Sequence, residues 1–412
     1  MDDGTDKASA RHLIVIYSLR GGGAERTLIN LLHRLGPDAK EVKLLIGVGG
    51  GVLEAEVPAC VQREWLFRSS FLARVCFWLF RKRIFRAPLK LAWRAKNRQQ
   101  YSSAVSFLDS FLTDLVVESC RAEKKVTVVH SDFESNPNYQ FGKLNKARRE
   151  FLRKHRYLPL DTIAFVSRSA LDAFERTIGR LDNFEILPIL FSPEEIRLRS
   201  DQPVELVSKP PGPAADDAKA QKVFHFVCIG SLLPVKGHDL LLDACELLAK
   251  GGYQFHLHIV GDGPRKDALL DQVGRLGLDP FVTLHGFMKN PYPILAASDC
   301  LVLPSVSEAM PTVICEAHAL GVPVMASDCE GCRNLLEGGE FGLIFGRKKA
   351  VLAESMISFI ESAELRADLR RKGQLWLESY DTDEVLQRYH KLIGLAEDSG
   401  SARLPAESGV AT

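Results

Sequence analysis

A short apolar run followed by a turn with a carboxylate and then a helix constrains this chain more than any other stretch. Cys300 to Pro304 has the composition of an interior strand. Pro311 stands where the first turn of a helix tolerates a residue without an N–H. Glu308 is therefore expected in the turn and Glu316 on the helix, so that both can face one ligand. A helix N-terminus suits a diphosphate, and carboxylates accept hydrogen bonds from sugar hydroxyls, so the stretch predicts a nucleotide-sugar site.

The same succession of strand, turn and helix occurs in both halves of the chain. Leu13 to Tyr17 leads through Gly21-Gly22-Gly23 into an expected amphipathic helix from Thr27 to Leu35. Phe224 to Gly230 opens a second series after a polar segment rich in proline and glycine at 209–217. Because 412 residues exceed one ordinary domain, we expect two α/β cores of about 200 residues each.

The glycine turn near the N-terminus permits positive φ and a close backbone approach to a ligand. It is not the dinucleotide fingerprint, because the glycine spacing is incomplete and no acidic residue ends the next expected strand, Val42 to Val48. A tight turn between a strand and a helix would also account for these glycines.

Composition argues against several classes of protein. The net charge of +1 provides no general field for nucleic acid. No eighteen-residue apolar run without charges supports a membrane span, and residues 1–6 lack the features of a signal peptide. Nine scattered cysteines favour a reducing compartment, and Cys329-x-x-Cys332 lacks the second ligand pair of a zinc site. We therefore expect a cytoplasmic protein.

Glu308 and Glu316, together with Pro311 and Gly321-Val-Pro-Val324, resemble the donor-site signature of retaining family-4 glycosyltransferases of the GT-B fold. The glycine turn resembles the Gly-Gly-Ala-Glu-Arg loop of bacterial polysaccharide glycosyltransferases. The resemblance extends over about 12–395 and is strongest over 224–346. A chance pair of glutamates is the alternative for the pair alone.

This resemblance implies an α/β fold of two Rossmann-like domains that face a central cleft, with retention of anomeric configuration and no metal requirement. We expect an acceptor-side domain, a flexible linker, a nucleotide-sugar domain, a helix that crosses back to the first domain, and a disordered tail. Their respective bounds are 1–195, 196–222, 223–382, 383–396 and 397–412.

The resemblance also implies roles for individual residues. Glu308 would bind donor sugar hydroxyls, Glu316 the ribose and Lys236 the diphosphate. His130, at the end of an expected strand, would lie near the transferred sugar, although structural hydrogen bonding is the usual role of a lone histidine there. The expected catalytic residues are His130, Lys236 and Glu308, and the expected donor-binding residues are Gly21, Gly22, Gly23, Ser231, Lys236, Gly263, Glu308, Met310, Pro311, Thr312 and Glu316.

Ser231 departs from the pattern, because an arginine that grips the diphosphate usually stands at this position. Serine supplies neither a charge nor a bidentate fork. Lys236 and the helix end could neutralise the diphosphate without it, or another cation such as Arg333 could take its place.

Residues 63–100 contain eleven Lys or Arg, one acid and eight aromatic residues, including Trp65, Trp78 and Trp93. This composition predicts surface helices divided at Pro88 that lie on anionic lipid headgroups, with a lipid-linked acceptor at the inner face of the plasma membrane. A helix with a core-facing stripe and a solvated basic face is the alternative. A second basic helix, expected over 143–156, faces either an acceptor phosphate or solvent.

Asp381-Thr-Asp383 has the spacing of a metal motif, but a helix N-cap at Thr382 or Asp383 is the better interpretation. The expected partners are thus a UDP- or GDP-linked sugar, a glycan acceptor and a membrane surface, with no nucleic acid, cofactor or metal. A non-catalytic GT-B scaffold subunit is the main alternative, and a nicotinamide oxidoreductase is a weaker one.

Overall fold

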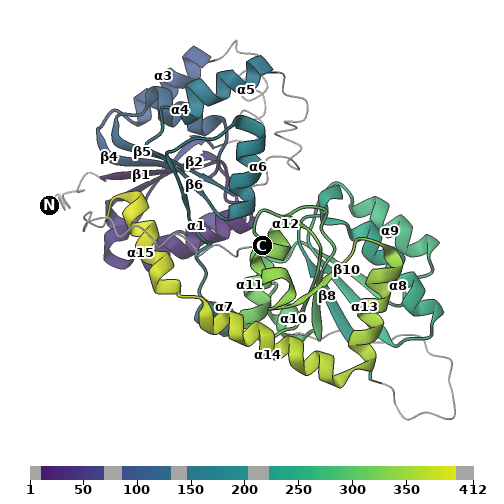
Figure 1. The fold of residues 1–412 in the computed structure, drawn as a ribbon. Helices are drawn as coiled ribbons and strands as arrows, with labels where there is room; N and C mark the ends of the chain where they lie inside the picture. The colour runs from purple at the N-terminus through teal and green to yellow at the C-terminus, as the bar shows by residue number, and fades with distance from the viewer. Residues whose placement is uncertain (1–10, 69–85, 131–145, 203–221, 396–412) are drawn as a thin grey trace, which may run out of the picture.

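The computed structural model describes residues 11–68, 86–130, 146–202 and 222–395, which form two α/β lobes (Figure 1). The sheet of the first lobe has seven parallel strands in the order β3-β2-β1-β4-β5-β6-β7. Its strands are β1 His12–Ile16, β2 Val42–Val48, β3 Gln62–Phe67, β4 Tyr101–Ser106, β5 Ala122–Val129, β6 Thr162–Phe165 and β7 Phe184–Ile186. Its helices include α1 Gly23–Arg34, α3 Arg86–Lys96, α4 Phe111–Ser119, α5 Lys146–Leu152 and α6 Arg168–Ile178.

The second lobe has six parallel strands in the order β10-β9-β8-β11-β12-β13. The strands are β8 Phe224–Ile229, β9 Phe255–Val260, β10 Val282–Gly286, β11 Cys300–Leu303, β12 Val324–Ser327 and β13 Leu343–Phe345. The helices include α8 His238–Lys250, α9 Lys266–Arg275, α10 Tyr292–Ala297, α11 Thr312–Ala319, α12 Glu330–Leu335, α13 Lys349–Glu361 and α14 Ala363–Ser379. Two parallel sheets flanked by helices confirm the expected α/β class.

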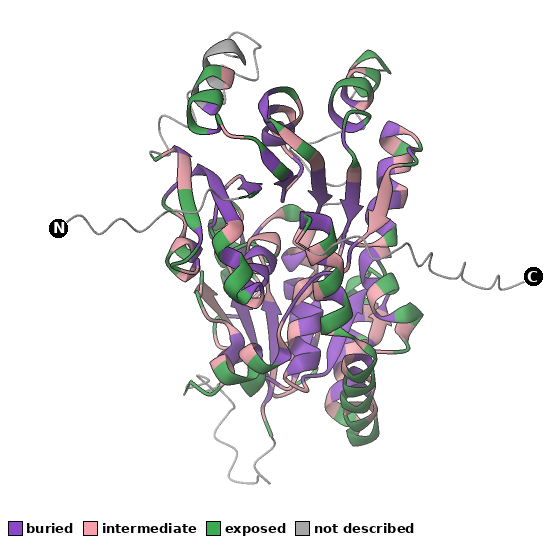
Figure 2. Cartoon of the chain, turned by 90° about the vertical axis from the view of Figure 1, so that its left-hand side faces the viewer, coloured by how far each residue is buried: buried purple, intermediate pink, exposed green. Residues whose placement is uncertain are grey.

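Apolar strand residues explain why these sheets form the centres of the lobes. All residues of β1 and β2 are buried, as expected for strands covered by helices on both faces, whereas many outward helix positions are exposed (Figure 2). In each sheet the strand order reverses at the centre, between β1 and β4 and between β8 and β11. Ligands of open parallel sheets bind at the carboxyl ends of strands at such a point.

Two segments connect the lobes and lie side by side. The segment leading into α7 (Pro193–Ser200) contacts the segment between α14 and α15 (Thr382–Ile393). The rings of Phe191 and Tyr380 are 5.1 Å apart, and the Tyr380 hydroxyl donates a hydrogen bond of 2.7 Å to the carbonyl of Ile189. Both passages of the chain between the lobes therefore run through one packed region.

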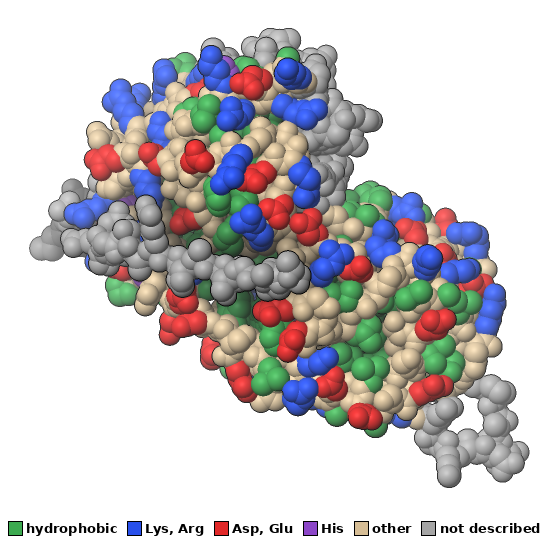
Figure 3. All heavy atoms as spheres, in the orientation of Figure 1, with side chains coloured by type: hydrophobic (Ala, Val, Ile, Leu, Met, Phe, Trp, Pro, Cys, Tyr) green, Lys and Arg blue, Asp and Glu red, His purple; other side chains and the backbone are tan. Residues whose placement is uncertain are grey.

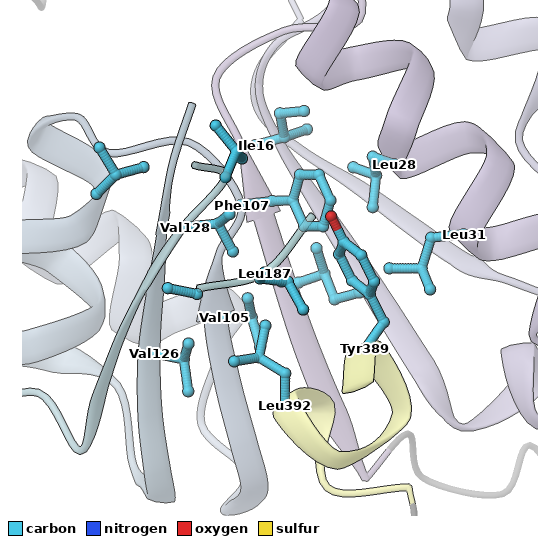
Figure 4. Close-up of a cluster of buried hydrophobic side chains, with 14 of the residues drawn as sticks. Ile16, Leu28, Leu31, Val105, Phe107, Val126, Val128, Leu187, Tyr389 and Leu392 are labelled. Carbon is cyan, nitrogen blue, oxygen red and sulfur yellow. The ribbon is translucent and has the colours of Figure 1, made fainter. Parts of the chain in front are cut away.

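Helix α15 completes the core of the first lobe. Figure 4 shows Tyr389 and Leu392 of this helix beside Val105 of β4 and Phe107, which directly follows β4. Arg34 of α1 also pairs with Asp383 at 2.8 Å. The end of the described chain is thus folded into the lobe in which the chain begins.

The structure corrects several expected elements near the lobe connection. Regular structure continues to Ser200 in α7, because Ser192 caps this helix and Pro193 occupies its first turn. Asp381, rather than Thr382 or Asp383, is the N-cap of α15, since its side chain accepts hydrogen bonds from the N–H groups of Asp383 and Glu384. The segments 203–221 and 396–412, which hold most of the expected linker and the expected tail, lie outside the described residues.

The basic segments also differ from expectation. Residues 62–67 form the strand β3 instead of a surface helix, and Pro88 lies inside α3. Trp93 is fully buried in the core, and the indole N–H of Trp65 donates to Glu54, so neither is an interfacial anchor. Trp78 lies in 69–85, outside the described residues.

The second basic helix, expected over 143–156, is helical throughout its described part, 146–156, and 143–145 lie outside the described residues. It is described as α5 and a following π-helical turn, Arg153–Tyr157. Arg156 of that turn is buried and pairs with Asp109 and Asp114, so it faces neither solvent nor an acceptor.

Charged side chains are interspersed on the face of the molecule shown in Figure 3, in keeping with the small net charge. No helix in the described parts of the chain combines the length and apolarity needed to cross a membrane.

Candidate functional site

The loop after β11, residues 304–311, carries the first carboxylate of the predicted site and is called the Glu308 loop below. The ammonium of Lys236 donates to both carboxylate oxygens of Glu308 at 2.7 and 2.9 Å, and the Ser305 hydroxyl donates to one of them at 2.6 Å. The side chains of Lys236 and Glu308 are 25% and 10% exposed, so the pair is reachable at the surface of the site. The structure thus brings together two of the three expected catalytic residues.

Close packing of two loops explains why Lys236 meets Glu308. Lys236 ends a 3-10 turn after β8, and Gly237 follows with φ of 70°. A Cβ at Gly237 would lie 2.2 Å from the carbonyl oxygen of Pro304, so only glycine allows this approach. The N–H of Val306 also donates to the carbonyl of Val235 at 2.7 Å. These contacts join the loops of β8 and β11 at the centre of the second sheet.

Glu316 lies in the second turn of α11, within a different electrostatic environment. Burial raises the pKa of its carboxyl to about 7, and the nearby positive charges of Arg26 and Arg199 oppose this rise. Both arginines also pair with Glu56 of the first lobe. Glu316 therefore faces charges from the lobe boundary, whereas Glu308 is paired with a lysine of its own lobe.

The glycine turn after β1 reaches the second lobe. Glu25 turns back to accept hydrogen bonds from the N–H groups of Gly21 and Gly22 at 2.6 and 2.7 Å. This capping starts α1 at Gly23, four residues before the expected Thr27, so Gly23 belongs to the helix and not to the turn.

Two of these glycines contact elements around the Glu308 loop. A Cβ at Gly21, whose φ is 112°, would lie 2.9 Å from the ring of Phe287. A Cβ at Gly23 would lie 3.1 Å from the hydroxyl oxygen of Thr312, the first residue of α11. The first lobe thus approaches the N-terminus of α11 with backbone rather than with charge.

The residues next to Glu308 are packed into the first lobe. Ala309 is buried in the core cluster of that lobe, and Met310 packs against the same cluster. The hydroxyls of Ser167 and Ser169 donate to the carbonyl of Ala309 at 2.7 and 3.1 Å. Pro311 is the N-cap of α11 instead of its first helical residue. The Glu308 loop is therefore shared between both lobes.

His130 follows β5 in the first lobe and packs against the ring of Phe107, 5.2 Å between centroids. Burial lowers the pKa of His130 to about 3, so its imidazole is neutral. Its Nε2 atom has no hydrogen-bond partner among the described residues. Within the same described parts of the chain, no hydrogen bond or ion pair joins His130 to Lys236 or Glu308.

The remaining predicted residues lie around the end of β8. Ser231 is exposed there. A Cβ at Gly263 would lie 2.7 Å from the carbonyl oxygen of Leu232, so Gly263 keeps the turn after β9 close to the loop after β8. Arg333, considered as a replacement cation, is exposed and bound to Asp328 at 2.6 Å. The charge of Arg333 is thus already paired within its own region.

Sequence reasoning assigned no site role to Arg26, Arg199, Ser167 or Ser169. Arg26 belongs to the Gly-Gly-Ala-Glu-Arg loop, and Ser167 stands before α6 as N-cap serines commonly do, so both gave a local signal. Arg199 and Ser169 gave none, because their importance depends on contacts between residues more than one hundred positions apart.

Residues 215–376 match the family model described as "Glycosyl transferases group 1". A Campylobacter jejuni protein named N-acetylgalactosamine-N,N'-diacetylbacillosaminyl-diphospho-undecaprenol 4-alpha-N-acetylgalactosaminyltransferase is 26% identical over 387 residues, covering 90% of this chain and 96% of that protein. D-inositol 3-phosphate glycosyltransferase of Rhodococcus erythropolis is 30% identical over 181 residues, 40% of each protein. The chain spans about half the length of two further relatives, uncharacterized glycosyltransferases of Methanocaldococcus jannaschii and Haemophilus influenzae, at 49% and 47%.

Solved structures resemble the whole described fold. Anabaena HepE in complex with UDP-glucose has a TM-score of 0.71 at 20% identity and covers 93% of this chain and 100% of its own. WaaG, a glycosyltransferase involved in lipopolysaccharide biosynthesis, has a TM-score of 0.62 at 15% identity and covers 92% and 99%. These likenesses confirm the expected two-lobed GT-B architecture.

Proposed function

We propose, from the match of residues 215–376 to the glycosyl transferases group 1 family model, that the chain transfers a sugar from a nucleoside-diphosphate sugar to a glycan acceptor with retention of configuration. The observation that carries the proposal is the Lys236–Glu308 pair at the centre of the second sheet, beside the N-terminus of α11. A cation, a carboxylate and a helix end at this point of an open sheet suit a sugar diphosphate.

The proposed chemistry is electrostatic. Negative charge develops on the leaving diphosphate as its bond to the sugar breaks, and Lys236 together with the N-terminus of α11 would stabilise it. Glu308 would accept hydrogen bonds from the donor sugar, and Glu316 from the ribose. Neutral His130 would lie near the transferred sugar as a hydrogen-bonding group. No step of this scheme uses a metal ion.

We propose UDP or GDP as the nucleotide and a lipid-linked or polysaccharide glycan as the acceptor. The likeness in fold to HepE, solved with UDP-glucose, supports a nucleotide-sugar donor. The name of the Campylobacter jejuni relative includes a sugar linked to diphospho-undecaprenol, which supports a lipid-linked acceptor.

Thermal unfolding with a panel of UDP- and GDP-linked sugars tests the donor, because a ligand that binds only the folded state raises the unfolding temperature. We expect one donor to raise it in the wild type and not in Lys236→Ala. Transfer from that donor to a short-chain lipid-diphosphate glycan is then followed by mass spectrometry, and NMR of the anomeric proton reports retention. Absence of stabilisation by every donor, or an inverted product, would contradict the proposal.

Peripheral membrane contact through 63–100 is proposed as the route to such an acceptor. Support now rests on the basic composition and on α3, where Leu91 is 71% exposed and Arg94 is exposed. Sedimentation with anionic vesicles should weaken in Leu91→Ser/Arg94→Ser and in variants of Trp78 and of 81–83. Equal sedimentation of wild type and variants would remove this part of the proposal.

A non-catalytic scaffold is the second candidate, favoured by one observation. Ser231 supplies no charge to a diphosphate, and Arg333 is bound to Asp328. Nucleotide-sugar binding without turnover on any glycan acceptor would favour this alternative.

A further inference from the structure

We propose that Ser167 and Ser169 are positioning residues that hold the Glu308 loop from the opposite lobe, an inference that rests on the proposed function. Two hydroxyls of the first lobe converge on a single carbonyl, that of Ala309, directly beside Glu308. These hydrogen bonds tie the position of the carboxylate to the contact between the lobes.

This cluster has two hydroxyl protons for three close oxygen contacts. Ser167 is the N-cap of α6, and its oxygen accepts from the N–H of Ala170 at 3.2 Å while its proton goes to Ala309. The hydroxyl of Ser169 lies 2.9 Å from that of Ser167 and 3.1 Å from the carbonyl oxygen of Ala309, and its single proton serves either oxygen. A carbonyl oxygen has two lone pairs, so it can accept both donors when Ser169 points to it. Ser167 therefore makes the shorter bond to Ala309, and Ser169 supplies a second donor to the same cluster.

Packing on both sides leaves the loop little freedom. On one side, Ala309 and Met310 pack with the core of the first lobe. On the other side, a Cβ at Gly331 would lie 2.1 Å from the carbonyl oxygen of Glu308, so α12 also lies against the loop backbone. The Glu308 loop is held between α6 of one lobe and α12 of the other.

The side chain and the backbone of this loop are held by different lobes. Lys236 and Ser305 fix the carboxylate of Glu308 from the second lobe. Ser167 and Ser169 fix the adjacent carbonyl from the first lobe. Because a small misplacement of a catalytic group is costly, this division makes turnover depend on the hydroxyl pair even though neither serine touches the donor.

A second contact between the lobes provides a control. Arg176, later in α6, pairs with Glu330 of α12 at 3.3 Å, with side chains 48% and 39% exposed. Exposed ion pairs contribute little to stability. Arg176→Ala should therefore leave turnover unchanged.

The test compares substitutions that separate hydrogen bonding to Ala309 from capping of α6. Ser169→Ala removes one donor and leaves the capping side chain of Ser167 in place, and we expect kcat to fall about fivefold with donor KM within about twofold. Ser167→Asp keeps an oxygen for the cap but cannot donate to the carbonyl, so kcat should fall while the unfolding temperature holds. Ser169→Thr keeps the hydroxyl and should restore turnover.

A double-mutant cycle with Glu308→Gln shows whether the serine acts through Glu308. We expect Ser169→Ala to cause no further loss of kcat in the Glu308→Gln background. Equal kcat in Ser169→Ala and wild type, or a full fivefold additional loss in that background, would overturn the inference.

Hydrogen exchange of peptides covering 304–311 tests the same inference without turnover. Exchange should be faster in Ser169→Ala than in wild type and unchanged in Arg176→Ala. If wild type transfers no sugar, the proposed function fails by itself, and this measurement decides the holding role. Identical exchange in Ser169→Ala and wild type would refute that role whatever the activity.

Discussion

Asp109 and Glu308 occupy comparable positions in the two lobes. The groups around Asp109 enclose it and serve the fold, whereas those around Glu308 leave it accessible to a ligand. Each follows a central strand, β4 or β11, and each pairs with a cation. Asp109 also accepts from Tyr157 at 2.9 Å and from Thr113 at 3.2 Å, and its side chain is 2% exposed. Glu308 has Lys236 and Ser305 as partners and remains partly accessible.

The contrast indicates how one sheet arrangement serves two purposes. In the first lobe the carboxylate at the sheet centre is enclosed by groups that satisfy it, and the neighbouring turn approaches the second lobe with glycines. In the second lobe the carboxylate and its lysine stay reachable. The reachable lysine and carboxylate thus belong to the second lobe, while the first lobe supplies close backbone contacts, hydroxyl groups and the charge of Arg26 near Glu316.

Removing Asp109 should have the largest effect on stability. Asp109→Ala leaves the buried guanidinium of Arg156 with Asp114 as its carboxylate partner among the described residues, and we expect a loss of about 3–5 kcal/mol in the free energy of unfolding. Urea denaturation measures it. Glu308→Gln is the matched variant and should change stability little. Similar losses in both variants would break the comparison.

Lys236→Ala should have the largest effect on transfer. The variant removes the cation proposed for the diphosphate and leaves Glu308 with Ser305, so we expect kcat to fall about 10²-fold or more. Steady-state kinetics with the donor identified by thermal shift provides the measurement. Arg333→Ala is the control and should retain wild-type kcat, because Arg333 is bound to Asp328. Wild-type activity in Lys236→Ala would contradict the assignment of charge to the second lobe.

Gly21→Ala tests whether the close contact between the backbone of the first lobe and Phe287 matters for donor binding. The new Cβ would meet the ring of Phe287 at 2.9 Å, and φ of 112° is strained for alanine, so we expect donor KM to rise about tenfold. Gly36→Ala has positive φ but no atom within 4 Å of the added Cβ, and it isolates backbone strain from contact between the lobes. An equal rise in both variants would mean that contact with Phe287 is unimportant.

We expect the donor kinetics to depend on pH through Glu316, with a smaller effect than those above. With its pKa raised to about 7, the carboxylate is ionised only above neutrality, and the ionised form accepts hydrogen bonds from ribose. We therefore expect kcat/KM for the donor to rise about fourfold from pH 6.5 to pH 8, and Glu316→Gln to flatten this part of the profile. A profile that the substitution leaves unchanged would place the titration elsewhere.

The raised pKa of Glu316 also determines whether its contribution to stability rises or falls with pH. The folded value of about 7 exceeds the ordinary value of 4.5, so burial of Glu316 favours its protonated form. Its contribution to stability is fully present below about pH 4.5 and is lost as pH rises through about 7. Substrate binding and stability should therefore change in opposite directions over this range.

Local sequence signals predicted the strands and many of the helices. β2 begins and ends as expected, because its apolar run is a strong signal. The capping signals of Ser192 and Pro193 went unrecognised, since α7 has little apolar periodicity. Trp93 was assigned to the wrong side of its helix, because composition does not show which face meets the core.

For the site, the sequence predicted residues of the second lobe better than their partners. Glu308 and Lys236 belong to compact motifs, and the structure joins them directly. The bond from Ser167 to Ala309 spans 142 positions, and no local pattern specifies which carbonyl a capping hydroxyl will reach. Contacts between lobes depend on how the two cores dock, which a reading of short motifs does not provide.

The two connecting segments lie side by side at Phe191 and Tyr380, so the lobes are joined at one place about which they could rotate. Such a rotation would keep the two lobes linked by both segments. Hinge motions of this kind are common in proteins that enclose a ligand. Cleavage of the chain at Tyr380 would leave one connecting segment between the lobes and would separate α15 from the rest of the chain. Tyr380 lies just before α15, so the segment that leads into this helix belongs to the region about which the lobes would rotate.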